Sequence, residues 1–359
     1  MYAAIVAGGG GTRLWPMSTQ KKPKQFHSFI GDSPLLVESV ERLAPLVDRK
    51  HVLISTTKQL FSSCRALLPD IPEQNFIIEP TARNTGPAVG LLAAILQKRD
   101  KDAVVAALWS DHHIGRPEEF RTVLATAEET VENHPDSVVT IGINPTEPST
   151  GFGYIQMNHF SEDIHGRRVF RMKKFVEKPD YQTAKRYVSS WEYMWNAGYF
   201  IFRADTMLKL FKQYAPDMYS GLVKIQKAFG TRREENVLAS EFAKFPNEPI
   251  DTLIAEKAAA SMYVIPADLE WSDIGSWSTL HDILANKFGS DVIVKGHHIG
   301  HEDQGVLVFA GEKMIATIGL KDVVIVDTPD ALLIANKDKA QDVKKILEKL
   351  KEQGKHLYL

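Results

Sequence analysis

Short apolar runs alternate with amphipathic stretches along the first 145 residues. The apolar runs are rich in Val and Ile and too short for helices, which predicts buried strands. They lie at Ala3–Ala7, Val52–Ser55, Phe76–Ile78, Ala103–Leu108 and Val138–Ile143. The stretches between them have helical periodicity and lie at Leu35–Val47, Lys58–Leu68, Pro87–Arg99 and Glu118–Asn133. A strand followed by a helix, four times over, predicts an α/β fold with a Rossmann-like, mostly parallel sheet flanked by helices.

The pattern from Thr150 to about Lys287 is mixed. Strands are predicted at Tyr154–Met157, Val169–Val176, Tyr199–Phe202 and Met262–Ile265. Helices are predicted at Tyr181–Ser189, Thr206–Tyr214, Leu222–Phe229, Ile250–Ala260 and Ser276–Asn286. We interpret this region as an extension of the same sheet and as the floor of a substrate pocket.

After about Gly289, short β runs are separated by Gly, Asp and Pro. Regular short strands with turn residues between them predict a compact β unit, built as one or two coils of a β-helix. The charged tail from Lys337 to Gly354 carries apolar residues at helical spacing, which predicts one capping helix. We therefore expect a large domain over residues 1–287 and a small β-rich domain with a terminal helix over residues 288–359.

Composition and charge narrow the class of protein. Hydrophobic residues make up 44% of the chain and charged residues 25%, which is enough apolar material for a full core and argues against disorder. The net charge of −2 provides no global basic field, so we expect no nucleic-acid partner. Cys64 is the one cysteine, which excludes an internal disulfide, a cysteine-based zinc site and an iron–sulfur cluster.

The chain also lacks the sequence features of export and membrane insertion. No apolar run approaches the roughly 20 residues of a membrane span. The first strand begins at Tyr2 with no charged segment before it, so we expect no secretory signal. These features predict a cytoplasmic protein with no membrane partner.

A glycine-rich loop, Gly8–Gly11, directly follows the first strand. Ligands of such sheets bind beyond the carboxyl ends of the strands, and glycines let backbone N–H groups approach phosphate oxygens. Arg13 stands where the dinucleotide fingerprint has its third glycine, and no Gly-Lys-Ser/Thr closes a P-loop. Arg13 within the loop and Lys24 shortly after it favour polyphosphate binding. An ordinary strand-to-helix turn with a basic surface run is the alternative.

Polar residues at other predicted strand ends and turns are further candidates. Asp111 follows the fourth strand and is suited to Mg²⁺, a hard ion that prefers oxygen ligands. The adjacent His112 and His113 raise the alternative of zinc, without a third ligand at helical spacing. Glu177-Lys178 ends a strand, and Asn196 and Asp273 lie between aromatic residues and next to or near glycines. On sequence alone, Glu177-Lys178 could also be a surface pair, and the segments of Asn196 and Asp273 could also be ordinary turns.

Eight segments in this order resemble those of the sugar-nucleotidyltransferase superfamily, and specifically of the mannose-1-phosphate guanylyltransferases (GDP-mannose pyrophosphorylases). The resemblance runs from residue 1 to about residue 335. The segments are Gly8–Pro16, Pro23–Phe26, Glu79–Pro87, Ser110–Ile114, Gly151–Tyr154, Phe175–Pro179, Asn196–Gly198 and Trp271–Trp277. Any one of them is a weak match, whereas the whole set in order is specific. Trp109 and Phe152 depart from the residues common in the family at these positions.

The resemblance implies a nucleotidyltransferase fold and a role for each matching residue, with residues 1–287 as the catalytic domain. The catalytic residues would be Arg13, Lys24, Asp111 and Lys178. GTP would be bound by Gly8, Gly9, Gly10, Gly11, Thr12, Arg13, Lys24, Glu79, Asn84 and Thr85. The sugar phosphate would contact Gly153, Glu177, Lys178 and Asn196, and Mg²⁺ would be held by Asp111 and Asp273.

The implied reaction transfers GMP from GTP to α-D-mannose 1-phosphate and yields GDP-mannose and pyrophosphate. The same chemistry on another hexose 1-phosphate or nucleotide is one alternative, because specificity depends on few contacts. A non-catalytic relative that binds a sugar nucleotide and regulates a partner is another. Some relatives carry a further isomerase domain, and because this chain ends at Leu359 we expect a single activity. We also expect a homodimer formed through the C-terminal β unit.

Overall fold

The protein is described by a computed structural model that covers residues 1–359, except for the side chains of residues 159–161. The described residues divide into two compact units. The first, here called the sheet unit, consists of residues 1–8, 39–110 and 114–271. The second, here called the β-helix unit, consists of residues 9–38, 111–113 and 272–359. The units are discontinuous in sequence, and the domain boundary expected after residue 287 stays a prediction.

The sheet unit is built on one large sheet, which comprises nine strands among the described residues. The order across the sheet is β3-β2-β1-β4-β9-β6-β10-β8-β7. The strands are β1 (Tyr2–Val6), β2 (Val52–Thr57), β3 (Phe76–Glu79), β4 (Val104–Trp109), β6 (Val138–Ile143), β7 (Tyr154–Ile164), β8 (Arg167–Val176), β9 (Tyr193–Arg203) and β10 (Met262–Ala267). The first four strands are parallel, as is the pair β6–β10. The α/β class and the extension of the sheet beyond residue 150 are therefore confirmed. In its pairings the sheet is mixed, because every pair that involves β8 or β9 is antiparallel.

The position of strand β9 within the sheet does not follow from the local sequence pattern. The fifth predicted strand, β6, does not neighbour β4, because β9 is inserted between them and runs antiparallel to both. Successive strand side chains point to opposite faces of a sheet. Accordingly, Tyr199 of β9 contacts Phe120 on one face, whereas its neighbour Phe200 joins the large core cluster on the other.

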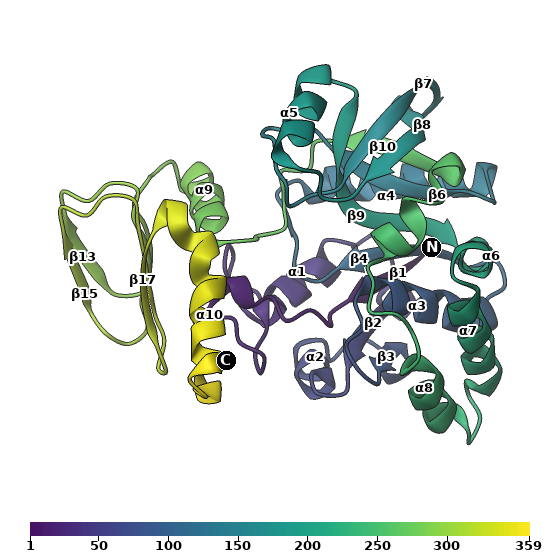
Figure 1. The fold of residues 1–359 in the computed structure, drawn as a ribbon, viewed down its shortest axis with the longest axis horizontal. Helices are drawn as coiled ribbons and strands as arrows, with labels where there is room; N and C mark the ends of the chain where they lie inside the picture. The colour runs from purple at the N-terminus through teal and green to yellow at the C-terminus, as the bar shows by residue number, and fades with distance from the viewer. The chain divides into compact units, whose positions relative to one another are not determined.

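Helices cover the sheet on both faces (Figure 1). Helix α4 (Pro117–Asn133), which carries Phe120, packs against β6, β9 and β10. Helices α3 (Thr85–Arg99), α6 (Ala204–Tyr214), α7 (Pro216–Ala228) and α8 (Glu234–Phe242) contribute to the cluster that holds Phe200. The remaining helices of this unit are α2 (Phe61–Leu67) and α5 (Tyr181–Ser190).

Three helical predictions need correction and one helix was not predicted. Helix α7 begins at Pro216 rather than at Leu222. Helix α1 spans Leu35–Glu41 rather than Leu35–Val47, and Pro45 explains an early end because proline disfavours helix in the residue before it. The helix predicted over Ile250–Ala260 is instead a short π-helix, Asp251–Ala255, followed by a 3₁₀ turn. Helix α8 was not predicted, because its apolar positions are too few to show a clear period.

The β-helix unit contains short strands arranged in coils, which confirms the expected C-terminal β unit. Strands β12 (Ile293–Lys295), β14 (Leu307–Phe309) and β16 (Val323–Asp327) stack in parallel, with β17 (Leu332–Asn336) added antiparallel. Strands β13 (His298–His301) and β15 (Ile315–Ile318) form a second parallel pair, side by side in Figure 1. Helices α9 (Trp277–Phe288) and α10 (Val343–Glu352) complete the unit, α10 being the expected terminal helix. Strands β5 (His113–Ile114) and β11 (Trp271–Ser272) lie where the chain passes between the units.

The core of the β-helix unit joins residues from the two ends of the chain. Leu14, Trp15 and Phe29 pack in one cluster with Trp277 and Phe309. The indole N–H of Trp277 donates a hydrogen bond to the backbone oxygen of Trp15 at 2.9 Å, and Phe29 meets the Trp277 ring edge-on at 6.0 Å. The segment that carries the glycine loop is therefore stabilised by C-terminal residues. In the part of the chain that the structure describes, none of the helices combines the length and apolar character that crossing a membrane requires.

Candidate active site

The glycine loop turns sharply into two 3₁₀ turns, Thr12–Leu14 and Lys24–Phe26. Gly11 adopts a φ of +50°, in the left-handed region that favours glycine. A Cβ at Gly11 would also lie 2.6 Å from Cβ of Lys24. The side-chain amide of Gln25 donates to the backbone oxygen of Gly9 at 3.2 Å. The loop therefore depends on glycine at position 11, and it brings the backbone of Gly11 against Lys24.

Lys24 is buried and held by two aspartates from distant parts of the chain. Its Nζ forms an ion pair with Oδ2 of Asp111 at 2.9 Å and donates to the backbone oxygen of Asp273 at 2.5 Å. Burial opposes ionisation of Asp111, but Lys24 and His112 outweigh it and the pKa of Asp111 falls below its usual value. Burial, with the Asp111 charge added, raises the pKa of Asp273. Arg13 is exposed and close enough to favour ionisation of Asp273.

The donor set of this cluster fits a hard divalent cation. Asp111 and Asp273 are near enough for each charge to act on the other, and a second cation would relieve the raised pKa of Asp273. No group of three or more His, Cys, Asp or Glu side chains among the described residues could hold a metal ion by itself. Mg²⁺ is typically held by one or two carboxylates together with waters and substrate phosphates. Two aspartates beside a glycine-rich loop suit that mode of binding.

In the sheet unit, Glu79 ends strand β3 and is buried, with 3% of its surface exposed. Its Oε1 accepts a hydrogen bond from the hydroxyl of Ser55 at 2.8 Å and lies 3.9 Å from where Gly8 would carry a Cβ. Burial raises the pKa of Glu79 to about 7. The Glu79 carboxyl group therefore lies next to Gly8, the first residue of the glycine loop.

Asn84 and Thr85 lie at the start of helix α3. Asn84 caps the helix, with its side chain accepting from the backbone N–H of Thr85 at 2.9 Å. Its φ of +65° is unusual for a residue other than glycine and marks local strain. The hydroxyl of Thr85 accepts from the backbone N–H of Ile250 at 2.9 Å. The segment predicted to bind the nucleotide is thus tied to residues near position 250.

Glu177 and Lys178 follow strand β8. Lys178 is exposed, has a φ of +44° and pairs with Oε1 of Glu177 at 2.5 Å. A Cβ at Gly153 would lie 2.7 Å from Oε2 of Glu177, so a side chain at position 153 would displace that carboxylate. Gly153 also accepts, through its backbone oxygen, from the backbone N–H of Asn196 at 2.8 Å.

The side-chain amide of Asn196 lies in a network that the sequence did not reveal. Its oxygen accepts from the Thr140 hydroxyl at 2.8 Å and from the Gly198 backbone N–H at 3.1 Å. Its nitrogen donates to Oδ1 of Asp251 at 2.8 Å. Burial, together with the charges of Glu177 and Glu256, raises the pKa of Asp251 to about 7. Asp251 was not among the predicted site residues because, in sequence, it resembles an ordinary acidic residue in the first turn of a helix.

The predicted residues thus gather in separate clusters. Lys24, Asp111, Asp273 and the loop residues 9–13 belong to the β-helix unit. Glu79, Asn84, Thr85, Gly153, Glu177, Lys178 and Asn196 belong to the sheet unit. Asp251 and Glu256 interact with the residues predicted to bind the sugar phosphate, and Glu256 accepts from the backbone N–H of Glu177 at 3.0 Å.

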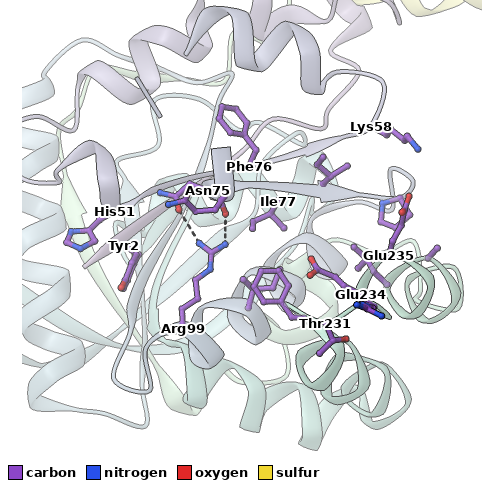
Figure 2. A pocket seen from close by; sticks show the side chains of 18 of the residues that line it. Tyr2, His51, Lys58, Asn75, Phe76, Ile77, Arg99, Thr231, Glu234 and Glu235 are labelled. Carbon is purple, nitrogen blue, oxygen red and sulfur yellow. Dashed lines mark hydrogen bonds between the residues drawn. The ribbon is translucent and has the colours of Figure 1, made fainter. Parts of the chain in front are cut away.

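A cavity of about 1300 Å³ lies elsewhere in the sheet unit, along the edge strand β3. Figure 2 shows Arg99 reaching toward Asn75 in this cavity, where its guanidinium donates to Oδ1 of Asn75 at 3.1 Å. Glu234 and Glu235 line the opposite side. None of the predicted site residues lines this cavity, so its size alone does not make it the active site.

Two family profiles match the chain. The profile described as "Nucleotidyl transferase" matches residues 2–288. The profile described as "MannoseP isomerase/GMP-like beta-helix domain" matches residues 296–350. The second description agrees with the coiled parallel strands of the β-helix unit.

Individual proteins are similar over the whole chain. A mannose-1-phosphate guanylyltransferase of Escherichia coli K12 is 37% identical, over 99% of this chain and 74% of its own length. The alginate biosynthesis protein AlgA of Pseudomonas aeruginosa is 34% identical, over 99% of this chain and 73% of its own length. A crystal structure named mannose-1-phosphate geranyltransferase, from Thermus thermophilus, superposes with a TM-score of 0.85 at 31% identity and covers 98% of this chain and 99% of its own. The chain spans about three quarters of the length of its curated relatives.

Proposed function

Because the chain belongs to the nucleotidyl transferase family, we propose that it transfers GMP from GTP to α-D-mannose 1-phosphate. The products are GDP-mannose and pyrophosphate. The choice of substrates is supported by full-length similarity to proteins named mannose-1-phosphate guanylyltransferase. The observation that carries the chemistry is the cluster in which Lys24 meets Asp111 and Asp273 beside the glycine loop.

The proposed reaction needs no protein nucleophile. A phosphate oxygen of mannose 1-phosphate attacks the α-phosphorus of GTP in line. The bond from that phosphorus to the bridging oxygen breaks, and pyrophosphate leaves with the electron pair. The attacking phosphate is already ionised at neutral pH, so no general base is required. Catalysis then consists of positioning the two substrates and neutralising charge at the transferred group.

Residues of the β-helix unit are proposed to act on the phosphates of GTP. The backbone N–H groups of Gly9–Gly11 and the hydroxyl of Thr12 would contact phosphate oxygens, and Arg13 would neutralise their charge. Lys24 would neutralise negative charge on the α-phosphate during transfer. Asp111 and Asp273 would hold Mg²⁺, which polarises the phosphoryl group when bound.

Residues of the sheet unit are proposed to bind guanine and the sugar phosphate. Glu79, Asn84 and Thr85 would form the guanine side with Gly8, because a purine with a 2-amino group needs an acceptor. Lys178, which is exposed and charged, would bind the phosphate of mannose 1-phosphate. Gly153, Glu177 and Asn196 would line the hexose site.

We further propose a homodimer formed through the β-helix unit. Exposed apolar side chains support this: Ile299 of β13 and Ile318 of β15 lie on one sheet, and Leu332 and Ile334 project from β17. The register of β13 and β15 places Ile299 and Ile318 on the same face. Large apolar side chains gathered on a surface commonly mark an interface.

The experiment that tests the function is pyrophosphate release in the presence of Mg²⁺. GTP, ATP, UTP and dTTP are each paired with mannose 1-phosphate and with glucose 1-phosphate. We expect release with GTP and mannose 1-phosphate, at a kcat/KM well above that of every other pair. Release only with another pair would support the proposed mechanism but show that the substrates are assigned wrongly. No release from folded protein that still binds GDP-mannose would overturn catalysis in favour of a regulatory relative.

A further inference from the structure

Residues 248–256 form one short segment that contacts both predicted substrate regions of the sheet unit. On the nucleotide side, the backbone N–H of Gly86 donates to the backbone oxygen of Glu248 at 3.0 Å. A Cβ at Gly86 would lie 2.7 Å from that same oxygen, so glycine is needed for this close approach. The Thr85 hydroxyl accepts from Ile250, the residue before Asp251. The position of Asp251 is therefore set by the start of helix α3.

On the sugar side, the same segment meets two residues of the proposed hexose site. Glu256 accepts from the backbone N–H of Glu177 at 3.0 Å. Asp251 accepts from the Asn196 amide at 2.8 Å and interacts electrostatically with both Glu177 and Lys178. The backbone between them is a π-helix, which is rare and is found frequently at functional sites.

The hydrogen bonds in this region leave Asp251 better suited than Asn196 to contact a ligand. The oxygen of the Asn196 amide accepts from the Gly198 backbone N–H and lies within hydrogen-bond distance of the Thr140 hydroxyl, whose one proton is shared with the backbone oxygen of Tyr199. Asn196 is also buried, with 7% of its surface exposed. Asp251 is partly exposed, and the bond from Asn196 uses its Oδ1 and leaves Oδ2 as an acceptor. The Glu177 carboxylate is close enough for its charge to act on Asp251, and Lys178 pairs with Glu177, so two acidic acceptors lie near one lysine. Hydroxyl groups are neutral donors that satisfy such acceptors without adding charge.

We propose that Asp251 binds a hydroxyl group of the hexose 1-phosphate and determines sugar specificity together with Glu177. The Asn196 amide holds the Asp251 carboxylate in place, while Oδ2 accepts the hydroxyl proton of the sugar. The inference rests on the proposed function and adds to it a residue that neither the sequence motifs nor the family resemblance assigned.

The test compares Asp251→Asn with the unaltered protein on mannose 1-phosphate and on its 2-, 3-, 4- and 6-deoxy analogues. Asparagine keeps the shape of the side chain and an acceptor for Asn196, but replaces the second acceptor by a donor. A hydrogen bond to a charged group contributes enough to change kcat/KM by about 10- to 100-fold. We expect a loss of that size on mannose 1-phosphate, with KM for GTP changed less than twofold. One deoxy analogue should show the same kcat/KM with both proteins, because it lacks the hydroxyl that Asp251 binds.

A uniform loss on all analogues would overturn the inference, because it would mean that Asp251 only positions Asn196. Glu241→Gln is the matched control: it alters a carboxylate of the same unit that is bonded to Lys224 and Lys244, and it should leave the analogue pattern unchanged. Measuring the binding of GDP-mannose and of GDP distinguishes the loss of a sugar contact from a folding defect. We expect Asp251→Asn to weaken binding of GDP-mannose but not of GDP, and equal weakening of both would contradict the role. Failure of the proposed function itself would appear in the unaltered protein, as absence of GDP-mannose formation.

Discussion

At the scale of single residues, Asp111 and Asp273 have opposite pKa shifts although they share one lysine. Lys24 pairs directly with the Asp111 carboxylate, and it meets Asp273 through the backbone oxygen. The Asp273 carboxylate is therefore the less neutralised of the two, and its pKa rises with burial while that of Asp111 falls. A bound cation would therefore favour ionisation of Asp273 more than that of Asp111, which Lys24 already neutralises.

The first prediction is that Asp111→Asn and Asp273→Asn each lower kcat by about 100- to 1000-fold, the loss typical when one preorganised electrostatic contact is removed. The Mg²⁺ concentration required for half-maximal rate should also rise. The measurement is pyrophosphate release over a Mg²⁺ titration. Asp32→Asn, at an exposed position of the same unit, is the control. Near-normal rates in both variants would refute the metal assignment.

Replacement of Lys178 tests whether the sugar phosphate and GTP are assigned to the right residues. It is exposed and paired with Glu177 in the sheet unit. We expect Lys178→Ala to raise KM for mannose 1-phosphate about 10-fold or more, because a charge-assisted contact to phosphate is lost. KM for GTP should change much less, and initial rates with each substrate varied in turn provide the measurement. The reverse pattern would show that the two substrates are assigned to the wrong residues.

Glu79 makes stability depend on pH. Its pKa is about 7 in the folded protein against an ordinary value of 4.5, because burial disfavours the charged form. Folding therefore takes up a proton, so the stabilising effect of the neutral carboxyl is complete below about pH 4.5 and is lost as pH rises to about 7. Glu79→Gln should be the more stable protein at pH 8, by up to about 3 kcal/mol.

Denaturant unfolding at a series of pH values checks the Glu79 prediction. The difference in free energy of unfolding between Glu79→Gln and the unaltered protein should be constant above about pH 7 and shrink steadily from there to about pH 4.5. A difference that does not change with pH would mean that Glu79 titrates at an ordinary value.

At the scale of elements, the backbone geometry of the glycine loop requires glycine at position 11 but not at position 9. Gly11→Ala combines a positive φ with a Cβ placed 2.6 Å from Lys24, and we expect it to lower the free energy of unfolding by roughly 2–4 kcal/mol. Gly9→Ala is the matched comparison, since no heavy atom of the described residues, apart from Gly9 and its two chain neighbours, lies within 4 Å of its Cβ position. Thermal unfolding of both variants gives the measurement, and equal stabilities would contradict the strain at Gly11.

The helices and strands differed in how well local pattern located them. Strands β1, β2, β3, β4 and β6 were found within one or two residues, because a buried parallel strand appears as a continuous apolar run. The segment after Ile250 has helical periodicity, yet it forms a π-helix. The backbone N–H of Ile250 donates to Thr85, and the side chain of Glu256 accepts from the backbone N–H of Glu177. These contacts with residues far away in sequence override a local preference.

At the scale of the whole molecule, the exposed apolar residues of the β-helix unit provide a test of the proposed dimer. The unaltered chain should sediment at twice its mass of 40.2 kDa. Replacing Ile299 and Ile318 together by Lys, or Leu332 and Ile334 together by Lys, should shift the species toward monomer in whichever pair lies in the interface. Tyr181→Lys, at an exposed apolar position of the sheet unit, is the control. A monomer at all concentrations of the unaltered chain would exclude the dimer.

The sequence by itself determined the alternation of strands and helices, the glycine loop, the C-terminal coils and the order of the charged motifs. Each of these depends on residues that are neighbours in the chain, so period and spacing are enough to show them. Glycine, proline and charged residues at strand ends indicate turns and candidate binding residues from the neighbouring sequence alone.

Tertiary structure alone decided three features: the insertion of β9 between β4 and β6, the joining of Trp15 and Phe29 to Trp277, and the contact of Asp251 with Asn196. Each brings together groups separated by tens or hundreds of residues. The free energy of such contacts comes from burial and hydrogen bonding between distant segments, and no local pattern records which distant partner a residue will have. For the same reason, the motifs pointed to Asn196, whereas the fold was needed to find Asp251 beside it.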